Sequence, residues 1–300
     1  MNSPFGKSSF GKSPFGKHFG AALARHMRSA GPWPFITFRS YVLAGRHIIW
    51  RARQHRKGLD RTARAVEAEP VPCWQSETYN WITGLVFAIG SALFMLGAAL
   101  SLIPREVWPP SAGIANAVFF AGSLPFTVAG YMQHFQAANA GAFSLAPTPA
   151  APRAIAVIGW QPRSVGWLST FTQFLGTLAF NLNTFDALHA PEGATAQDLL
   201  VWAPDLLGSL LFLVSGYLAF IETSRGYWSW KPKMLAWRIV FANLLGCIAF
   251  MTAAVLAYVP AGPEAGWIPV LANVHLFLGA LGFLVGALLS MRESATAGQS

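Results

Sequence analysis

The chain has 300 residues, of which 54% are hydrophobic and only 11% charged, with a formal net charge of +9. Soluble proteins average about 25% charged residues, so this composition excludes an ordinary soluble domain and indicates a membrane protein. A disulfide is not expected between the two cysteines, because Cys73 precedes the first apolar segment and Cys247 lies in the middle of a later one.

Residues 1–20 repeat the triplet Phe-Gly-Lys, and the Ser, Gly and Pro residues between the repeats disfavour a packed core. We therefore predict a disordered basic tail over 1–33. The stretch 6–13 matches a phosphate-binding loop pattern, but a working loop needs a strand before it and a helix after it. We interpret this match as a by-product of the repeat.

Residues 34–73 form a second basic segment. Apolar residues such as Tyr41 and Ile48 recur at helical spacing over 36–57, while arginines seven residues apart define another face (Arg39, Arg46 and Arg53). This pattern predicts a basic amphipathic helix in the membrane interface, although Gly45 weakens it. Residues 51–64 are strongly basic but contain no motif that reads nucleic acid, so we expect no nucleic-acid partner.

Six apolar segments follow, over residues 81–103, 112–132, 167–185, 202–221, 239–259 and 268–290. Each is long enough to cross a hydrocarbon core of about 30 Å. Short gaps join them in pairs, which predicts three helical hairpins. The expected fold is all-α, with six transmembrane helices.

The same skeleton recurs in the three hairpins. Two tryptophans seven positions apart lead to a glycine and then to phenylalanine four positions later, as in Trp74, Trp81, Gly90 and Phe94. A second glycine and phenylalanine recur in each returning segment. The six glycines are predicted to let helix backbones approach closely (Gly90, Gly122, Gly176, Gly208, Gly246 and Gly279).

This repetition predicts hairpin repeats over 74–136, 160–222 and 223–293, with a linker over 137–159 and a short tail over 294–300. Three parallel repeats suggest a pseudo-threefold arrangement about the membrane normal. Polar residues recur 14 positions after the second glycine of each hairpin, at Gln136, Glu222 and Glu293. We interpret these as marking the membrane rim, with Glu222 paired to Arg225 or to a neighbouring hairpin.

The distribution of charge predicts orientation. Of the 21 Lys and Arg residues, 13 precede Cys73, and the second and fourth connections carry five more. Basic residues in short loops favour the cytoplasmic side. We therefore expect both termini in the cytoplasm of a bacterial plasma membrane.

The motifs I-G-S-A-L-F (89–94) and A-G-S-L-P-F (121–126) resemble the YrhK-like family of small bacterial membrane proteins, and residues 175–180 and 207–212 are similar again. The resemblance covers the hairpins and not the basic N-terminal region. It implies a membrane architecture and no reaction.

Polar and ionisable residues inside membrane segments are candidates for function. Five of them fall near the predicted outer ends of the third, fourth and sixth segments (Asn181, Asn183, Asp186, Asp205 and His275). If these ends met, they would form a proton-relay or cation site. The alternative is that they cap or connect helices. No metal motif, cofactor motif or nucleophile elbow occurs, so we expect no metal, no cofactor and no enzyme activity.

Two functions remain open. The preferred hypothesis is a structural or interaction protein, embedded in the lipid bilayer, whose residues 1–64 bind anionic lipid or a cytoplasmic protein. The alternative is a transporter or channel for a small solute or ion that uses the five polar residues above.

Overall fold

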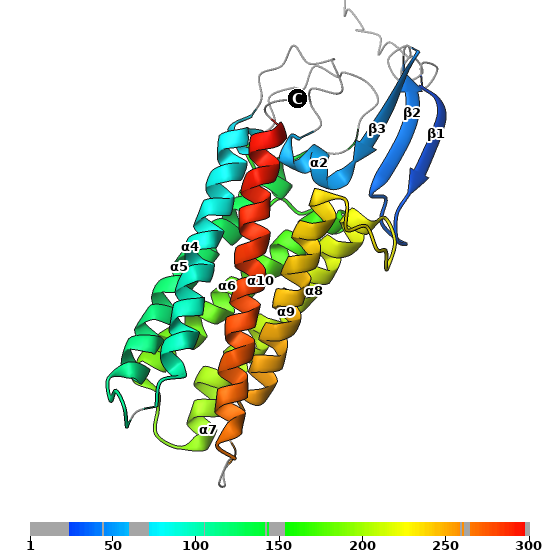
Figure 1. The fold of residues 1–300 in the computed structure, drawn as a ribbon. Helices are drawn as coiled ribbons and strands as arrows, with labels where there is room; N and C mark the ends of the chain where they lie inside the picture. The colour runs from blue at the N-terminus through cyan, green and yellow to red at the C-terminus, as the bar shows by residue number, and fades with distance from the viewer. Residues whose placement is uncertain are drawn as a thin grey trace, which may run out of the picture.

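Figure 1 shows a computed structural model of the chain, which describes residues 24–43, 45–59, 72–104, 106–141, 143, 154–258, 260 and 265–297. The predicted repeats over 1–20 lie outside the described residues. The main body is a bundle of long helices: α4 (Glu77–Ser101), α5 (Ser111–Asn139), α6 (Val165–Asp186), α8 (Ala203–Ser224), α9 (Leu235–Leu256) and α10 (Trp267–Ala297). Between α6 and α8 the chain forms three short helical turns, η2 (Ala187–His189), α7 (Ala194–Gln197) and the π-helical η3 (Asp198–Trp202).

Within the described residues, five helical stretches are long and apolar enough to cross a membrane: Glu77–Ser101, Ser111–Asn139, Ala194–Ser224, Leu235–Leu256 and Trp267–Thr296. The chain is therefore an integral, multi-pass membrane protein. The predicted span over 167–185 is not among them. Its helix, α6, has 22 residues, but Gln173, Asn181, Asn183 and four threonines reduce its mean hydropathy.

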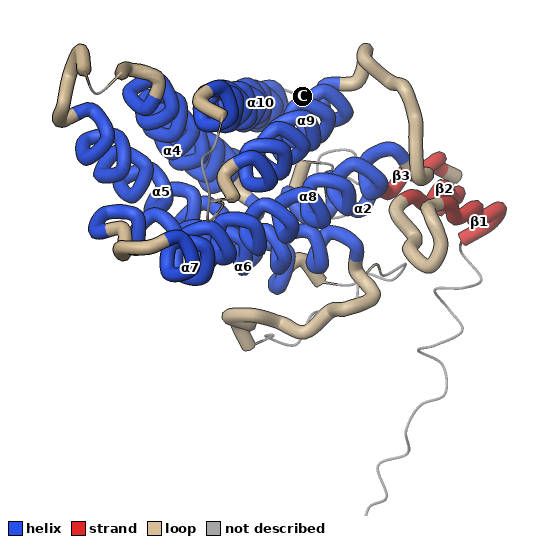
Figure 2. The backbone as a smooth tube through the Cα atoms, turned by 90° about the horizontal axis from the view of Figure 1, so that it is seen from below, coloured by secondary structure: helices blue, strands red, loops and turns tan. Residues whose placement is uncertain are grey.

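The long helices form a closed ring. In the order α4, α5, α6, α8, α9 and α10, each helix packs against the next, and α10 packs against α4. Figure 2 shows this arrangement from one end of the bundle. The predicted hairpins are neighbouring pairs in the ring: α4 with α5, α6 with α8, and α9 with α10.

The two glycines of each pair lie face to face. A Cβ atom on Gly90 would lie 3.1 Å from the carbonyl oxygen of Gly122, and one on Gly122 would lie 3.3 Å from that of Gly90. The corresponding distances are 3.1 and 3.2 Å for Gly176 and Gly208, and 2.9 and 3.1 Å for Gly246 and Gly279. The same close backbone contact therefore occurs in all three pairs.

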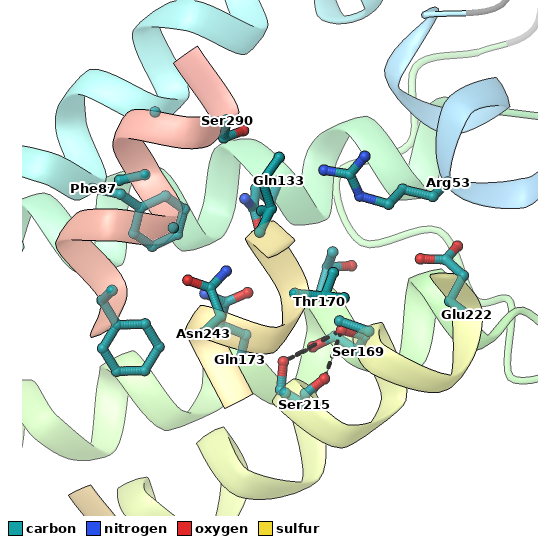
Figure 3. A pocket seen from close by; sticks show the side chains of 18 of the residues that line it. Arg53, Phe87, Gln133, Ser169, Thr170, Gln173, Ser215, Glu222, Asn243 and Ser290 are labelled. Carbon is teal, nitrogen blue, oxygen red and sulfur yellow. Dashed lines mark hydrogen bonds between the residues drawn. The ribbon is translucent and has the colours of Figure 1, made fainter. Parts of the chain in front are cut away.

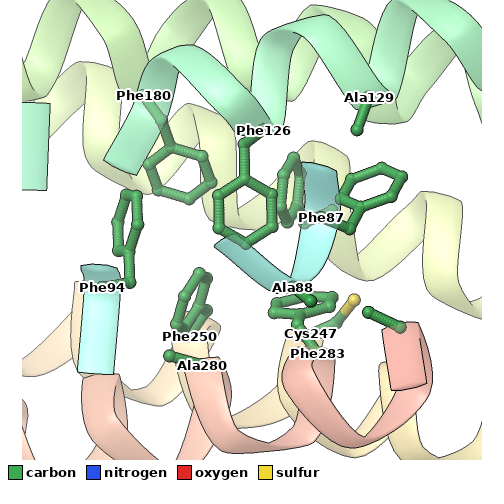
Figure 4. Close-up of a cluster of buried hydrophobic side chains, with 12 residues drawn as sticks. Phe87, Ala88, Phe94, Phe126, Ala129, Phe180, Cys247, Phe250, Ala280 and Phe283 are labelled. Atoms are coloured by element: carbon green, nitrogen blue, oxygen red, sulfur yellow. The ribbon is translucent and has the colours of Figure 1, made fainter. Parts of the chain in front are cut away.

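The phenylalanines that follow these glycines meet at the centre of the ring. Figure 4 shows this cluster, in which Phe94 contacts Phe126 and Phe250, with ring centroids 5.3 and 5.9 Å apart. Phe283 lies 5.7 Å from Phe212 and 5.2 Å from Phe250. Every pair of helices thus contributes aromatic rings to one core, with edge-on and tilted contacts that aromatic pairs prefer.

The second tryptophan of the later two pairs is packed inside the bundle. Trp167 and Trp237 are almost fully buried, and each stacks on a phenylalanine four residues later, with centroids 4.7 and 4.5 Å apart. The indole N–H of Trp167 donates to the carbonyl oxygen of Ile158, and that of Trp237 to Ser229. Trp81 is 40% exposed, so the first pair lacks this arrangement.

A small antiparallel sheet stands at one end of the bundle, which corrects the all-α prediction. Its strands are β1 (Ala24–Ala30), β2 (Phe38–Leu43) and β3 (Arg46–Arg51), in that order. β1 lies within the tail that the sequence predicts to be disordered over 1–33. Residues 36–57 were predicted as one amphipathic helix, but they form β2, a turn, β3 and the short helix α2 (Ala52–Lys57).

The turn at Gly45 explains this difference. Gly45 has a φ of +76°, a left-handed conformation that glycine adopts readily, and it reverses the chain between β2 and β3. Tyr41 then pairs with Ile48, and Phe38 with Arg51. Side chains alternate between the faces, so Tyr41 and Trp50 are buried while Ile49 is 41% exposed.

Candidate functional site

The five polar residues predicted to form an outer site do not meet. The amide of Asn181 donates to Thr127 Oγ1 at 2.8 Å, and that of Asn183 donates to the carbonyl oxygen of Val201 at 2.8 Å. His275 Nδ1 lies 2.8 Å from the carbonyl oxygen of Leu271 in its own helix.

Asp186 is the last residue of α6, and Asp205 lies in the first turn of α8. Among the described residues, no hydrogen bond or ion pair joins two of these five side chains. Helices α6 and α10 are also not neighbours in the ring. Asn181 and Asn183 therefore connect α6 to neighbouring segments, and His275 bonds within its own helix.

A polar cavity lies instead inside the ring, at the end that carries the sheet. It encloses about 90 Å³, which is room for several water molecules. Phe87, Phe212 and Phe283 belong to its lining and to the aromatic core, so the core closes the cavity toward the far end. Figure 3 shows its polar side chains.

Amide side chains form part of the walls. Gln133 comes from α5, Gln173 from α6 and Asn243 from α9, so each of the three helix pairs contributes one. None of the three makes a hydrogen bond to another described residue. Ser169 and Ser215, in contrast, bond each other's carbonyl oxygens at 3.0 and 2.7 Å. The free amides leave donors and acceptors available to a molecule in the cavity.

Equivalent positions of the repeated skeleton line this cavity. Phe87, Gln173 and Asn243 each lie three residues before the first glycine of their pair. Eleven residues after the second glycine come further lining residues, Gln133, Ala219 and Ser290. The cavity is therefore the place where corresponding faces of the three helix pairs converge.

Helix α2 forms the roof of the cavity through buried ion pairs. Arg53 donates to both carboxylate oxygens of Glu293, at 2.5 and 2.8 Å, and Lys57 Nζ lies 3.0 Å from Glu293 Oε2 and 3.1 Å from Ser290 Oγ. Arg56 Nη2 lies 2.7 Å from Glu222 Oε2. Burial lowers the pKa of Lys57 to about 8, although attraction from Glu293 opposes this shift.

The rim residues are thus docking points for α2. Glu222 pairs with Arg56 of α2, while the predicted alternative partner Arg225 lies over the ring of Phe38, 3.9 Å from its centroid. Gln136, the third rim residue, donates to the carbonyl oxygen of Trp74 at 2.6 Å and to Asn80 Oδ1 at 3.0 Å. Asn80 in turn donates to the carbonyl oxygen of Lys57 at 2.9 Å.

Charge in the roof is not balanced. Three cations, Arg53, Arg56 and Lys57, face two carboxylates, Glu222 and Glu293, which leaves one excess positive charge. The Nε atom of Arg56 is buried and has no hydrogen-bond partner among the described residues. Buried polar atoms normally have a partner, so this N–H is available to a ligand or to water.

Sequence reasoning overlooked the wall amides. Their signal was a polar residue at a fixed offset from a repeated glycine, as at Gln173 and Asn243 inside otherwise apolar segments. Within the part of the chain that the structure describes, no group of three His, Cys, Asp or Glu side chains is placed to hold a metal ion. Comparison with family models, with curated proteins and with solved structures finds no significant match.

Proposed function

We propose that this protein binds a small polar solute in the cavity and moves it across the membrane. The proposal includes α6 as a sixth crossing, three repeated hairpins, and both termini in the cytoplasm of a bacterial plasma membrane. The sheet and α2 then stand on the cytoplasmic side, which agrees with the bias of Lys and Arg toward that side. The resemblance to the YrhK-like family is compatible with this proposal, because it implies an architecture and no reaction.

The observation that carries the proposal is the set of three free amides in the cavity between the helix pairs. A polar group without a partner in an apolar bundle costs about 1–3 kcal/mol. Gln133, Gln173 and Asn243 are half-buried, so water or a solute in the cavity can take the hydrogen bonds that these amides do not make within the protein. Transporters with internal repeats bind their substrates at the interface between the repeats, and this cavity occupies the corresponding place.

The aromatic core supports transport over a permanent pore. Phe87, Phe212 and Phe283 close the cavity on one side, while α2 covers the other. A site closed on both sides fits a carrier that opens to one side at a time.

The scaffold hypothesis is the alternative, and five of the thirteen basic residues of its segment lie in 1–23 and 60–64, outside the described residues. It relied on basic residues of the segment 1–64 reaching anionic lipid or another protein. Arg53, Arg56 and Lys57 instead bind carboxylates of the same chain.

Stopped-flow light scattering of proteoliposomes tests the proposal. Vesicles are mixed with isosmotic urea, glycerol, or the potassium salts of acetate and phosphate, with valinomycin to carry potassium. The wild type should accelerate swelling in at least one solute, and Asn243→Leu and Gln173→Leu should slow it by about tenfold, the equivalent of one lost hydrogen bond.

Asn273→Leu is the matched control, because Asn273 is half-buried, lies outside the cavity lining and, among the described residues, bonds the carbonyl oxygen of Pro269 in its own helix. It should swell as the wild type does. Wild-type vesicles that swell no faster than empty liposomes in every solute would refute transport.

A further inference from the structure

A second hollow lies beside the cavity. It is a groove of about 720 Å³ between the sheet and the adjoining ends of α5 and α6. Aromatic rings line it, among them Trp50, Phe143 and Trp160, and Trp160 is 74% exposed. The groove is more open and larger than the cavity, so it can serve as an entrance.

Among the described residues, Arg56 and Glu222 are the two that line both the groove and the cavity. They form the ion pair with a 2.7 Å contact, and their side chains are only 12% and 2% exposed. A Cβ atom on neighbouring Gly166 would lie 2.5 Å from Glu222 Oε1 and 2.8 Å from Arg56 Nε. Glycine at 166 therefore leaves the room that this pair occupies. The ion pair is the partition between the two spaces.

The charged side chains on both sides of the partition are mainly positive. The groove is lined by Arg39, Arg56 and Arg163 with one carboxylate, Glu222. The charged residues that line the cavity, among those that the structure describes, are Arg53, Arg56, Lys57 and Glu222. Glu293 pairs with Arg53 and Lys57 from outside the lining, which leaves one excess positive charge. A cleft with charges mainly of one sign concentrates ions of the opposite sign.

We propose that the solute is a small oxyanion, a carboxylate or a phosphate, which enters the cavity from the groove by replacing Glu222 on Arg56. This inference rests on the proposed function and names the class of its solute. The guanidinium keeps an anionic partner throughout the exchange, and the displaced Glu222 carboxylate must turn to the groove, which it also lines. Beyond the partition, the Arg56 Nε atom and the amides of Gln173 and Asn243 supply further donors.

The chain contains a reporter for this route. Cys247 is buried and lines the cavity, whereas Cys73, the other cysteine in the sequence, is exposed. In a Cys73→Ser background, labelling therefore reports access to the cavity alone. Methanethiosulfonate reagents of similar size carry either a sulfonate, which mimics an oxyanion, or a trimethylammonium group.

The experiment measures labelling rates in phosphatidylcholine proteoliposomes. Glu222→Gln should increase the rate with the sulfonate reagent at least about tenfold, because a neutral amide holds the guanidinium more weakly than a carboxylate does. The trimethylammonium reagent should label slowly in both proteins. Inorganic phosphate should protect Cys247 from the sulfonate reagent.

Glu293→Gln shows how much labelling changes when α2 is loosened and the Arg56–Glu222 pair is kept, because Glu293 binds Arg53 and Lys57 but lines neither space. The proposal predicts a smaller acceleration in this variant than in Glu222→Gln. Equal acceleration by both variants would mean that α2 has simply loosened, and would contradict the role of the Arg56–Glu222 pair as the partition. Labelling by the cationic reagent as fast as by the anionic one would contradict the proposal that the solute is an oxyanion. Unchanged rates in Glu222→Gln, in protein whose gel-filtration profile is that of the parent, would overturn the route.

A further set of vesicles also contains phosphatidylglycerol. Labelling that slows only in these vesicles would show that a lipid headgroup occupies the groove, which contradicts entry of a free anion. Failure of this inference is distinguishable from failure of the proposed function. Swelling in urea or glycerol without selective labelling would support transport but contradict an oxyanion as the solute. Selective labelling without swelling in any solute would support an oxyanion-binding cavity but contradict transport.

Discussion

Glu293 is the carboxylate that Arg53 and Lys57 share, and its replacement by glutamine tests how α2 is held. In the structure both carboxylate oxygens accept from Arg53, and one of them also contacts Lys57. All three side chains are about 90% buried. Glu293→Gln keeps the shape of the side chain and leaves two buried cations without their counter-charge.

Removing one partner of a buried ion pair costs about 3–5 kcal/mol, because the remaining charge stays out of water. Part of this loss depends on pH through Lys57. Its pKa is about 8 in the folded protein and 10.5 ordinarily, and burial is the main cause of the decrease. Below about pH 8 the ammonium is charged and attracted to Glu293, so the variant loses that attraction. Above about pH 8 the folded amine is neutral, and this part of the loss disappears.

The destabilisation should therefore shrink as pH rises from about 6.5 to about 9. In the wild type, Lys57 makes stability rise between pH 8 and 10.5, because the unfolded chain then binds more protons. Thermal unfolding in detergent micelles, followed by tryptophan fluorescence, measures both effects. The same comparison in a Lys57→Met background removes the pH dependence. A Glu293→Gln variant as stable as the wild type at about pH 6.5, or a loss of stability that grows with pH, would show that Glu293 does not hold α2 through these buried ion pairs.

Other predictions concern packing and the sheet. Gly176→Leu should prevent assembly of the bundle, because even a Cβ atom there would lie 2.6 Å from Phe212; Gly113→Leu, which has open space around its Cβ position, should assemble normally, as gel filtration of both proteins will show. Gly45→Val should destabilise the β2–β3 turn by about 1–2 kcal/mol, because a β-branched residue disfavours a φ of +76°; a variant that keeps the protease resistance of residues 38–51 would contradict this. Asn181→Leu should leave solute flux unchanged, since its hydrogen bond to Thr127 lies outside the cavity; a large loss of flux would return the site to the outer end.

The sequence was informative where spacing alone decides a contact. Gly90 and Gly122 are each followed by phenylalanine four positions later, and in a helix these residues lie on one face, one turn apart. The glycines meet within each helix pair, and the phenylalanines meet between pairs. The membrane class followed equally directly from the long apolar segments.

The sheet was not predictable from the same patterns. Tyr41, Val42, Ile48 and Ile49 fit a helical face, but they also fit two short strands around a turn. Such short apolar runs are ambiguous between helix and strand, and Gly45 was the deciding residue. The wrong choice hid α2 and with it the partners of Glu222 and Glu293.

The cavity depended on how each helix is rotated about its axis. Gln173 faces the cavity and Asn181 contacts α5, although both are polar residues of α6. In the sequence, only the offset of Gln173 from the repeated glycine separates the two positions, because neighbouring helices set the rotation. Ionisable residues such as Asp205 and His275 attracted attention by their charge, whereas the polar side chains in the cavity walls are neutral amides and hydroxyls below a charged roof.

The most direct test of a polar, solute-accessible cavity is whether water reaches the centre of the bundle. A nitroxide spin label is attached at Gln173→Cys in a Cys73→Ser, Cys247→Ser background, and at Leu178→Cys for comparison, since Leu178 is 40% exposed on the same helix. Electron spin echo envelope modulation in D₂O then measures water near each label in lipid vesicles. A hydrated cavity should give deep deuterium modulation at 173 and shallow modulation at 178. Shallow modulation at both positions would contradict a polar, solute-accessible cavity.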